Sequence, residues 1–265
     1  MDLRPLGNTG IRVAPIGLGT VKLGRSAGLK YAAPVRIPDD DEAISLLRAA
    51  ADLGVNLIDT APAYGVAEER LGRLLPQVAP RQSWVLTTKV GETFDPQADA
   101  GRGASTYDLS SAAIVASVER SLTRLRTQTL DVVLLHFSGG VSDQAAILKQ
   151  GGAIDALRGL QRRGLARAIG ASTAGLDAAL AAIEIGVDVL MLTLNHDERS
   201  ELPALARARE AGIGVLVKKP LASGRLPTGN AAPQALREVL DHAGVASAVV
   251  GTTNPARLRA LVAAN

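Results

Sequence analysis

The stretch Val55-Asn56-Leu57-Ile58-Asp59-Thr60-Ala61-Pro62-Ala63-Tyr64-Gly65 sets a pattern that the rest of the chain repeats. Its apolar start predicts a buried strand over residues 55–61, with Asp59 at the carboxyl end and Tyr64 in the loop that follows. A buried carboxylate is costly unless a cation pairs with it. The stretch therefore raises the question of whether the rest of the chain supplies a cation for Asp59 and a partner for the Tyr64 hydroxyl.

Apolar runs of this kind alternate with amphipathic segments along the chain. The predicted strands cover residues 16–20, 55–61, 84–90, 130–136, 165–172, 187–194, 214–220 and 246–252, and the predicted helices cover 42–53, 67–78, 110–125, 150–163, 175–185, 200–211, 233–243 and 255 onward. Eight such βα units fit a single (β/α)₈ TIM barrel domain over residues 1–265. An N-terminal hairpin over residues 3–13 is expected to cap the barrel floor, and 24–40 and 91–109 are expected to be loops. An open doubly wound sheet is the alternative, because periodicity does not show closure.

The composition is that of an ordinary globular protein, with 265 residues, 47% hydrophobic residues, a net charge of +3 and no cysteine. No apolar run approaches the ~20 residues of a membrane span, and the N-terminus lacks a signal-peptide pattern, so we expect a cytoplasmic protein without a membrane partner. The basic cluster at 158–167 is interpreted as a solvated helix face rather than a nucleic-acid site, because no aromatic residues interleave with it. His196 and His242 lack acidic or cysteine partners at ligand spacing, so no metal site is predicted.

Two further strand ends supply partners for Asp59 and Tyr64. Lys89 ends the strand at 84–90, and His136 ends the strand at 130–136. All strands of a (β/α)₈ barrel deliver their carboxyl ends to one rim, where active sites form. Singly, these residues have ordinary explanations: a structural ion pair for Asp59 and Lys89, a buried histidine, a rim tyrosine. Their convergence on consecutive strand ends favours a catalytic site.

Aromatic residues support the same rim. Aromatics make up only 2% of the chain. The five expected in or beside the loops at the strand exits are Tyr31, Tyr64, Phe94, Tyr107 and Phe137. We interpret them as the walls of a pocket for an organic substrate.

Taken in order, these segments resemble the aldo-keto reductases. The matching motifs are Asp59-Thr60-Ala61 with Tyr64-Gly65, Thr88-Lys89, Leu134-Leu135-His136, Gly17-Leu18-Gly19-Thr20, Ile169-Gly170-Ala171-Ser172, Pro220-Leu221-Ala222-Ser223-Gly224 and Gly251-Thr252-Thr253-Asn254-Pro255. The resemblance covers nearly the whole chain and implies an NADPH-dependent carbonyl reductase. It implies that Tyr64 is the general acid, that Lys89 lowers its pKa and that Asp59 holds Lys89. His136 would orient the carbonyl and share the charge that develops on its oxygen.

The resemblance also implies a site for NADP(H) at the strand ends. The residues carried over are Gly19, Thr20, Asp59 and Ser172 at the nicotinamide, Leu221 and Ser223 at the pyrophosphate, Gly251, Thr252, Thr253 and Asn254 at the phosphates and ribose, and Arg257 at the 2′-phosphate; Thr173, Met191, Lys218 and Pro220 complete the predicted site. An arginine facing a phosphomonoester favours NADP over NAD. The alternative is that Arg257 is a surface residue of the last helix.

Several positions depart from the family pattern. Thr173 stands where Asn is common, Met191 where Gln is usual, and Lys218 where an aromatic ring stacks on the nicotinamide. Ala260 and Leu261 replace two polar residues that hold the adenine, so we expect weaker or differently posed cofactor binding. The chain ends at Asn265 without the long C-terminal loop of many relatives, and this truncation predicts an open pocket. A cation at Lys218 would disfavour the oxidised nicotinamide; alternatively its side chain reaches solvent.

The function expected from the sequence is NADP(H)-dependent reduction of a small-molecule aldehyde or ketone to the alcohol. A nicotinamide-binding regulatory protein that senses redox state with little turnover is one alternative, favoured by the departures above. A Schiff-base lyase using Lys89 is another. It is disfavoured because Asp59 beside Lys89 would keep the amine protonated.

Overall fold

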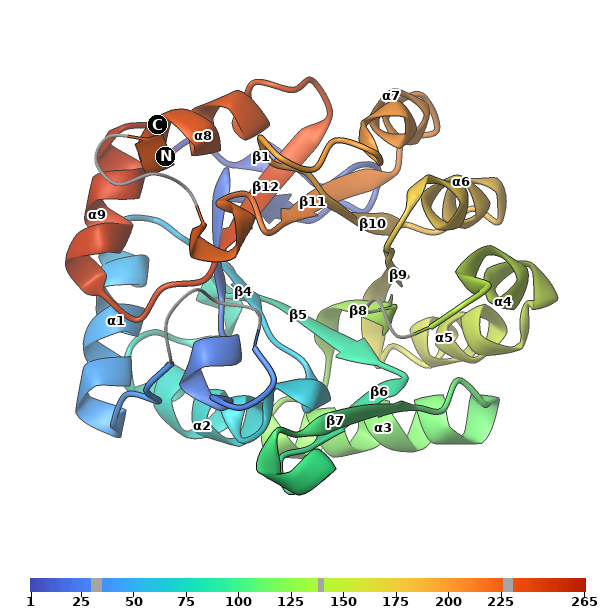
Figure 1. Cartoon of the computed structure of the whole chain (residues 1–265), viewed down its shortest axis with the longest axis horizontal. Coiled ribbons are helices and arrows are strands. Elements are labelled where there is room, and N and C mark those ends of the chain that lie inside the picture. The colour runs from blue at the N-terminus through green and yellow to red at the C-terminus, as the bar shows by residue number, and fades with distance from the viewer. Residues whose placement is uncertain (30–34, 138–140, 226–230) are drawn as a thin grey trace.

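The centre of the molecule is a closed barrel of eight parallel strands (Figure 1). The computed structural model describes residues 1–29, 35–137, 141–225 and 231–265. The barrel strands are β3 (Ile16–Gly19), β4 (Leu57–Asp59), β5 (Val85–Val90), β8 (Leu130–His136), β9 (Ala166–Ser172), β10 (Val189–Thr193), β11 (Gly214–Lys218) and β12 (Val245–Val250). They pair in this order, and β12 pairs with β3 to close the ring. The predicted TIM barrel is thus confirmed, and the open-sheet alternative is wrong.

Helices surround the barrel on all sides (Figure 1). They are α1 (Asp40–Asp52), α2 (Ala67–Leu74), α3 (Ser111–Arg124), α4 (Gln144–Gln150), α5 (Gly152–Arg162), α6 (Leu176–Glu184), α7 (Leu202–Glu210), α8 (Ala231–Leu240) and α9 (Pro255–Ala263). At the start of α1, Asp39 accepts from the backbone N–H of Glu42, whose side chain accepts from the N–H of Asp39. This capping box fixes where the helix begins. Within the described ranges, no helix has the length and apolarity needed to cross a membrane.

The barrel interior is filled by its own layer of apolar side chains, and the N-terminal hairpin completes that layer. Strands β1 (Arg4–Pro5) and β2 (Arg12–Val13) pair antiparallel, and the buried side chains of Leu6, Ile11 and Val13 join the interior cluster. Between the strands, the N–H of Asn8 donates to the carbonyl of Gly212 at 2.8 Å, at the entrance to β11. The hairpin therefore caps the floor, as predicted.

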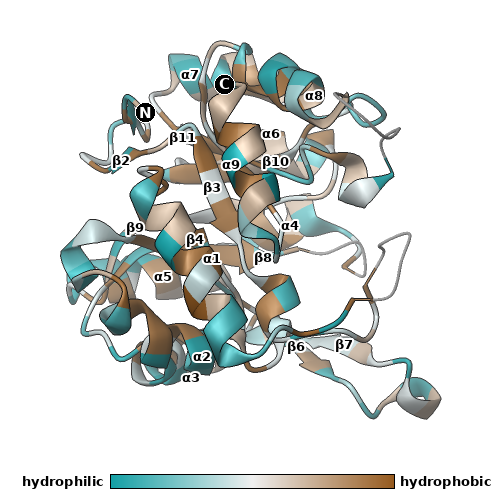
Figure 2. Ribbon diagram, turned by 90° about the vertical axis from the view of Figure 1, so that its left-hand side faces the viewer, coloured by the Kyte–Doolittle hydropathy of each residue, from teal (hydrophilic) through white to brown (hydrophobic). Residues whose placement is uncertain are grey.

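A second apolar layer lies between the strands and the helices, and Figure 2 shows the apolar strands at the centre of the molecule. Phe137 belongs to this layer and is fully buried. The expectation that Phe137 forms a pocket wall is therefore wrong, because its side chain packs outside the barrel. Tyr31 lies outside the described residues.

The segment expected to be a loop over residues 91–109 contains a two-stranded sheet. Strands β6 (Glu92–Asp95) and β7 (Ala104–Tyr107) pair antiparallel, with Glu92 opposite Tyr107 and Phe94 opposite Ser105. Figure 2 shows this hairpin extending away from the barrel. No apolar alternation marks these strands, because the two four-residue segments are mostly polar. The expectation of a loop is therefore wrong for residues 92–95 and 104–107.

Candidate active site

A buried lysine joins two of the predicted site residues at the carboxyl ends of the strands, called here the mouth of the barrel. The Nζ of Lys89 donates to Oδ1 of Asp59 at 2.7 Å and to the carbonyl of Thr60 at 2.9 Å. The same Nζ lies 4.7 Å from the centre of the Tyr64 ring. Lys89 is 1% exposed and Asp59 is 3% exposed. The cation that Asp59 required is therefore Lys89.

The strand register explains why these residues meet. Strands β4 and β5 are neighbours, and Asp59 pairs with Thr87, two residues before Lys89, on the same face of β5. On the other side of β4, the backbone N–H and the Oγ1 of Thr20 both donate to the carbonyl of Asp59, at 3.0 and 2.9 Å. Thr20 therefore anchors the backbone that carries the carboxylate.

Burial and charge act in opposite directions on the two proton-holding groups. For Lys89, burial favours the neutral amine, but Asp59 and Tyr64 outweigh it and raise the pKa. For Tyr64, burial is the largest effect and raises the pKa to about 12, although Lys89 acts to lower it. The expectation that Lys89 would leave Tyr64 with a lowered pKa is thus wrong for this state of the site. Tyr64 is a protonated phenol at neutral pH.

His136 reaches the same mouth and meets a residue that the sequence did not single out. Its ring lies edge-on to that of Tyr64, with centroids 6.1 Å apart. Its Nδ1 lies 2.7 Å from Oε2 of Glu92, the first residue of β6. Burial is the main reason why the pKa of His136 is lowered, so the ring is neutral at physiological pH.

Lys218, at the end of β11, turns across the mouth instead of into solvent. Its Nζ donates to Oγ of Ser172 at 2.9 Å and to the carbonyl of Thr173. Burial is the largest effect on this amine and lowers its pKa to about 8, and Lys89 and Lys219 act in the same direction. The alternative of a solvent-exposed side chain is wrong.

Two other predicted nicotinamide contacts have different surroundings. Oγ1 of Thr173 donates to Oε1 of Glu201 at 2.7 Å, and Oε2 of Glu201 accepts from the N–H of Thr193. Met191 is 1% exposed and belongs to the apolar cluster inside the barrel. The hydroxyl of Thr173 is thus already bonded, and the side chain of Met191 is packed inside the barrel. Glu201 was not predicted as a site residue, because it does not stand at the end of a strand.

The residues predicted to hold the phosphates lie after β11 and β12. Pro220 is buried, Leu221 and Ser223 are half-buried, and Gly251 and Asn254 are exposed on either side of Thr252 and Thr253. The segment after β11 holds non-glycine residues with positive φ, at 55° for Lys219, 47° for Ala222 and 56° for Ser223. Such backbone is uncommon and clusters at ligand sites. The side chain of Asn254 caps α9 by accepting from the N–H groups of Ala256 and Arg257.

A second cation lies close to Arg257 at the start of α9. Lys22, in the turn after β3, has its pKa lowered by burial and then by the nearby charge of Arg257. Two like charges beside a helix N-terminus form a surface where an anion would be stabilised. No sequence motif marks Lys22, because only the closed barrel brings β3 beside β12.

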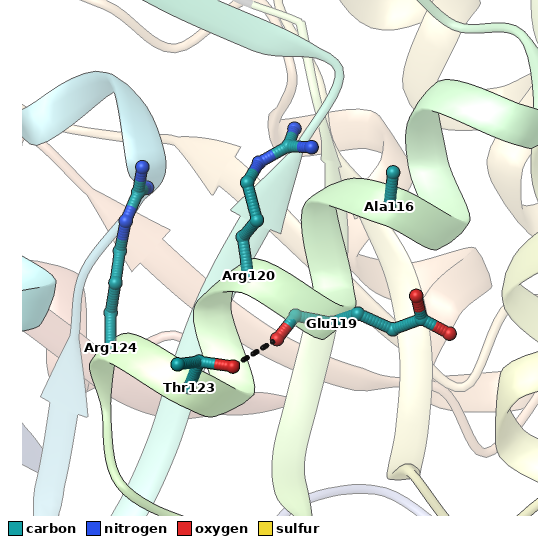
Figure 3. A pocket seen from close by; sticks show the side chains of 5 residues that line it. All are labelled: Ala116, Glu119, Arg120, Thr123 and Arg124. Carbon is teal, nitrogen blue, oxygen red and sulfur yellow. Dashed lines mark hydrogen bonds between the residues drawn. The ribbon is translucent and has the colours of Figure 1, made fainter.

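Other charged features lie away from the mouth. A hollow on α3 is lined by Ala116, Glu119, Arg120, Thr123 and Arg124 (Figure 3). These residues occupy the half of α3 that leads to the start of β8, at the floor end of the barrel. In the described part of the chain, no group of three or more His, Cys, Asp and Glu side chains is arranged to hold a metal ion.

The predicted basic cluster on α5 and its exit turn has acidic neighbours. Arg158 contacts Asp155 at 3.2 Å, and Arg163 contacts Glu119 at 3.4 Å. Arg167 contacts Asp131 at 2.7 Å. These pairs fit the interpretation of the cluster as a solvated surface.

Comparison with known proteins identifies the family to which a chain with this fold and this site belongs. The model of the aldo/keto reductase family matches residues 15–238, and the chain belongs to that family. It is therefore an oxidoreductase of a family that uses nicotinamide cofactors.

Individual relatives differ in what they act on. The chain is 32% identical over 236 residues to L-galactose dehydrogenase of Arabidopsis thaliana, covering 85% of this chain and 67% of that one. It is 29% identical over 238 residues to the NADH-specific methylglyoxal reductase of Escherichia coli, covering 84% and 68%. The chain thus spans about two thirds of the length of these relatives.

A solved structure from Pseudomonas aeruginosa, assigned to the aldo-keto reductases, is similar over almost the whole chain. It is 44% identical, with a TM-score of 0.85, and covers 99% of this chain and 93% of that one. The barrel and its floor hairpin therefore have a close structural counterpart.

Proposed function

We propose that this protein reduces an aldehyde or ketone to the alcohol, with NADPH as the hydride donor and Tyr64 as the general acid. The observation that carries the proposal is the buried contact of Lys89 with both Asp59 and the Tyr64 ring. An isolated ion pair would need no phenol beside it. A phenol alone would have nothing to stabilise its anion.

Three residues of the chain would take part in the proton transfer, one as the donor and two by stabilising the charge that it leaves. Tyr64 is protonated at neutral pH, since its pKa is about 12, and can donate to a carbonyl oxygen. The ammonium of Lys89 would then stabilise the phenolate, because an opposite charge within reach favours the ionised form. Asp59 would keep Lys89 charged and in place. Bound reduced nicotinamide would supply the hydride to the carbonyl carbon.

The predicted cofactor residues fit such a group at both ends. At the mouth, Ser172 and Lys218 present a hydroxyl and an ammonium, which suit a carboxamide oxygen. At the other end, the positive-φ backbone at Ala222 and Ser223 and the cations Lys22 and Arg257 suit a chain of phosphates. These features support a dinucleotide lying across β9, β11 and β12.

Arg257 provides a test of the preference for NADP. In Arg257→Ala, we expect the Kd for NADPH to rise about tenfold, because a charge-assisted contact with the 2′-phosphate is lost, while the Kd for NADH stays within about twofold. Fluorescence titration with both cofactors measures this difference. The matched control is Arg259→Ala, an exposed arginine of the same helix two residues away, which faces another side. Equal losses for NADPH and NADH in Arg257→Ala would contradict a 2′-phosphate contact.

Lys218 provides a test of how the mouth treats the charge of the nicotinamide. At pH 7 its amine is mostly protonated, since its pKa is about 8, and should repel the positively charged oxidised ring. In Lys218→Met, we expect the ratio of Kd for NADP⁺ to Kd for NADPH to fall about fivefold, which corresponds to about 1 kcal/mol of repulsion. Calorimetry with each cofactor form gives the ratio.

The pH dependence supplies the control for this experiment. Below pH 8 the ammonium is present and the wild-type ratio should be high, whereas well above pH 8 the neutral amine should leave wild type and Lys218→Met alike. An identical ratio in the two proteins at pH 7 would show that Lys218 does not act on the ring charge.

A turnover assay tests the proposal as a whole. The protein is first titrated with NADPH and NADH and then supplied with a panel of aldehydes and ketones, including methylglyoxal and aldoses, with nicotinamide absorbance as the readout. Consumption of NADPH with formation of the alcohol supports the proposal. Tight NADPH binding without turnover across the panel favours the regulatory alternative, for which the contact between Lys218 and Ser172 is the specific support. Failure to bind either cofactor contradicts both.

A further inference from the structure

Glu92 forms a buried acid–imidazole pair with His136 at the mouth of the barrel. Oε2 of Glu92 lies 2.7 Å from Nδ1 of His136, an ion-pair contact whose angle falls short of a linear hydrogen bond, and neither atom has a hydrogen-bond partner elsewhere among the described residues. Oε1 of Glu92 accepts from Oγ of Ser105 at 2.5 Å, across the β6–β7 hairpin. Glu92 is 4% exposed. One oxygen of the carboxylate is thus held by the hairpin, and the other is left for the imidazole.

Charged groups face this pair from several elements. Around His136 lie Glu92 from β6, Lys89 from β5, Lys218 from β11 and the Tyr64 ring; around Glu92 lie His136, Ser105 from β7 and Arg25 from the segment after β3. Burial alone would raise the pKa of Glu92, but His136, Ser105 and Arg25 together lower it. Glu92 is therefore a carboxylate at neutral pH.

One of the two atoms must carry a proton. A carboxylate oxygen and a bare imidazole nitrogen are both acceptors, and two acceptors 2.7 Å apart would repel each other. Since Glu92 is ionised, the proton belongs to the imidazole nitrogen that faces it. The nitrogen bound to such a partner determines the tautomer of the whole ring.

We propose that Glu92 is a positioning residue that holds the proton of neutral His136 on Nδ1, so that Nε2 faces the mouth as a hydrogen-bond acceptor. A neutral ring in this tautomer accepts a proton from a hydroxyl but has no N–H at Nε2 to offer a carbonyl. His136 becomes a donor at Nε2 only as the imidazolium, which Glu92 stabilises.

This assignment gives Tyr64 and His136 different roles in the reaction, and it rests on the proposed function. In carbonyl reduction at neutral pH, Tyr64 alone would supply the proton, and neutral His136 would accept a hydrogen bond from the Tyr64 hydroxyl or from the alcohol product. Protonation of His136 adds a second donor to the carbonyl, so reduction should accelerate as pH falls through the pKa of His136.

Nuclear magnetic resonance of the full chain without cofactor tests the tautomer directly. The chain has three histidines, and His136→Gln identifies the signals of His136. In ¹⁵N-labelled wild type, we expect the Nδ1–H tautomer for His136. In Glu92→Gln, we expect the pKa of His136 to fall by roughly one unit or more, because an opposite charge in contact is lost. An Nε2–H tautomer in wild type, or an unchanged pKa in Glu92→Gln, overturns the proposal.

Kinetics provide a second readout. In Glu92→Gln, the pH at which kcat for reduction rises should fall by the same amount as the pKa of His136. The KM for NADPH should not change. Glu92→Asp retains the charge and should retain part of the wild-type profile. A profile of Glu92→Gln that superimposes on that of wild type contradicts the proposal.

Glu68→Gln is the matched control for losing a buried carboxylate. Glu68 is 1% exposed and accepts from Oγ1 of Thr88, outside the mouth. Its pH profile should match wild type, and a shift equal to that of Glu92→Gln would overturn the assignment to Glu92. If the chain proves not to be a reductase, the tautomer and the pKa of His136 still decide the role of Glu92.

Discussion

Replacing Tyr64 by Phe is expected to lower kcat for carbonyl reduction by about 10²–10⁴-fold, the usual contribution of a positioned general acid. The substitution removes only the hydroxyl and keeps the ring that lies 4.7 Å from Nζ of Lys89. The Kd for NADPH should therefore stay within about twofold of wild type. Single-turnover measurements of NADPH oxidation at saturating cofactor give the rate.

Cofactor binding serves as the internal control for that experiment. A variant that binds NADPH normally and has lost turnover has lost the chemical step alone. If Tyr64→Phe kept more than about a tenth of the wild-type kcat, another group would be the proton donor, and the protonated form of His136 would be the first to examine.

Replacing Lys89 by Met is expected to lower the free energy of unfolding by about 3–5 kcal/mol, the usual cost of leaving one partner of a buried ion pair without the other. The carboxylate of Asp59 is 5% exposed and would lose its contact at 2.7 Å. Urea unfolding in the absence of cofactor measures the effect. The same variant should also lose reductase activity, because the Tyr64 phenolate would lose its cation.

A double variant separates stability from catalysis. Asp59→Asn combined with Lys89→Met removes both charges, so it should regain part of the lost stability while remaining inactive. The control is Lys149→Met, which breaks an exposed pair with Glu184 at 2.8 Å and should change stability by less than about 1 kcal/mol. Additive losses in the double variant would mean that the two charges do not stabilise each other.

The barrel was predictable because its signal repeats. Each strand is an apolar run followed by an amphipathic segment, and short connections leave few ways to arrange eight such units. The meeting of Asp59 with Lys89 was predictable for the same reason, since neighbouring parallel strands place their carboxyl ends together. Closure itself had no local signal; it follows from the pairing of β12 with β3.

The rest of the site depends on contacts that sequence spacing does not encode. Glu92 and His136 are 44 positions apart, and Glu92 lies in a short polar strand with no apolar alternation. Lys218 on β11 donates to Ser172 on β9, with β10 between the two strands. The direction of the Lys218 side chain therefore depends on how the long side chains pack at the mouth. The net rise in the pKa of Tyr64 required the burial of its hydroxyl to be weighed against Lys89, which only the folded chain defines.

The β6–β7 hairpin can change in sequence more freely than the barrel. Within the described part of the chain its strands pair only with each other, so insertions or exchanges at its tip leave every hydrogen bond of the barrel ladder intact. Changes of sequence at the tip should therefore cost little in folding. Glu92 at the base of the hairpin limits this freedom, because a change that displaces its carboxylate also alters the surroundings of the His136 imidazole at the mouth of the barrel.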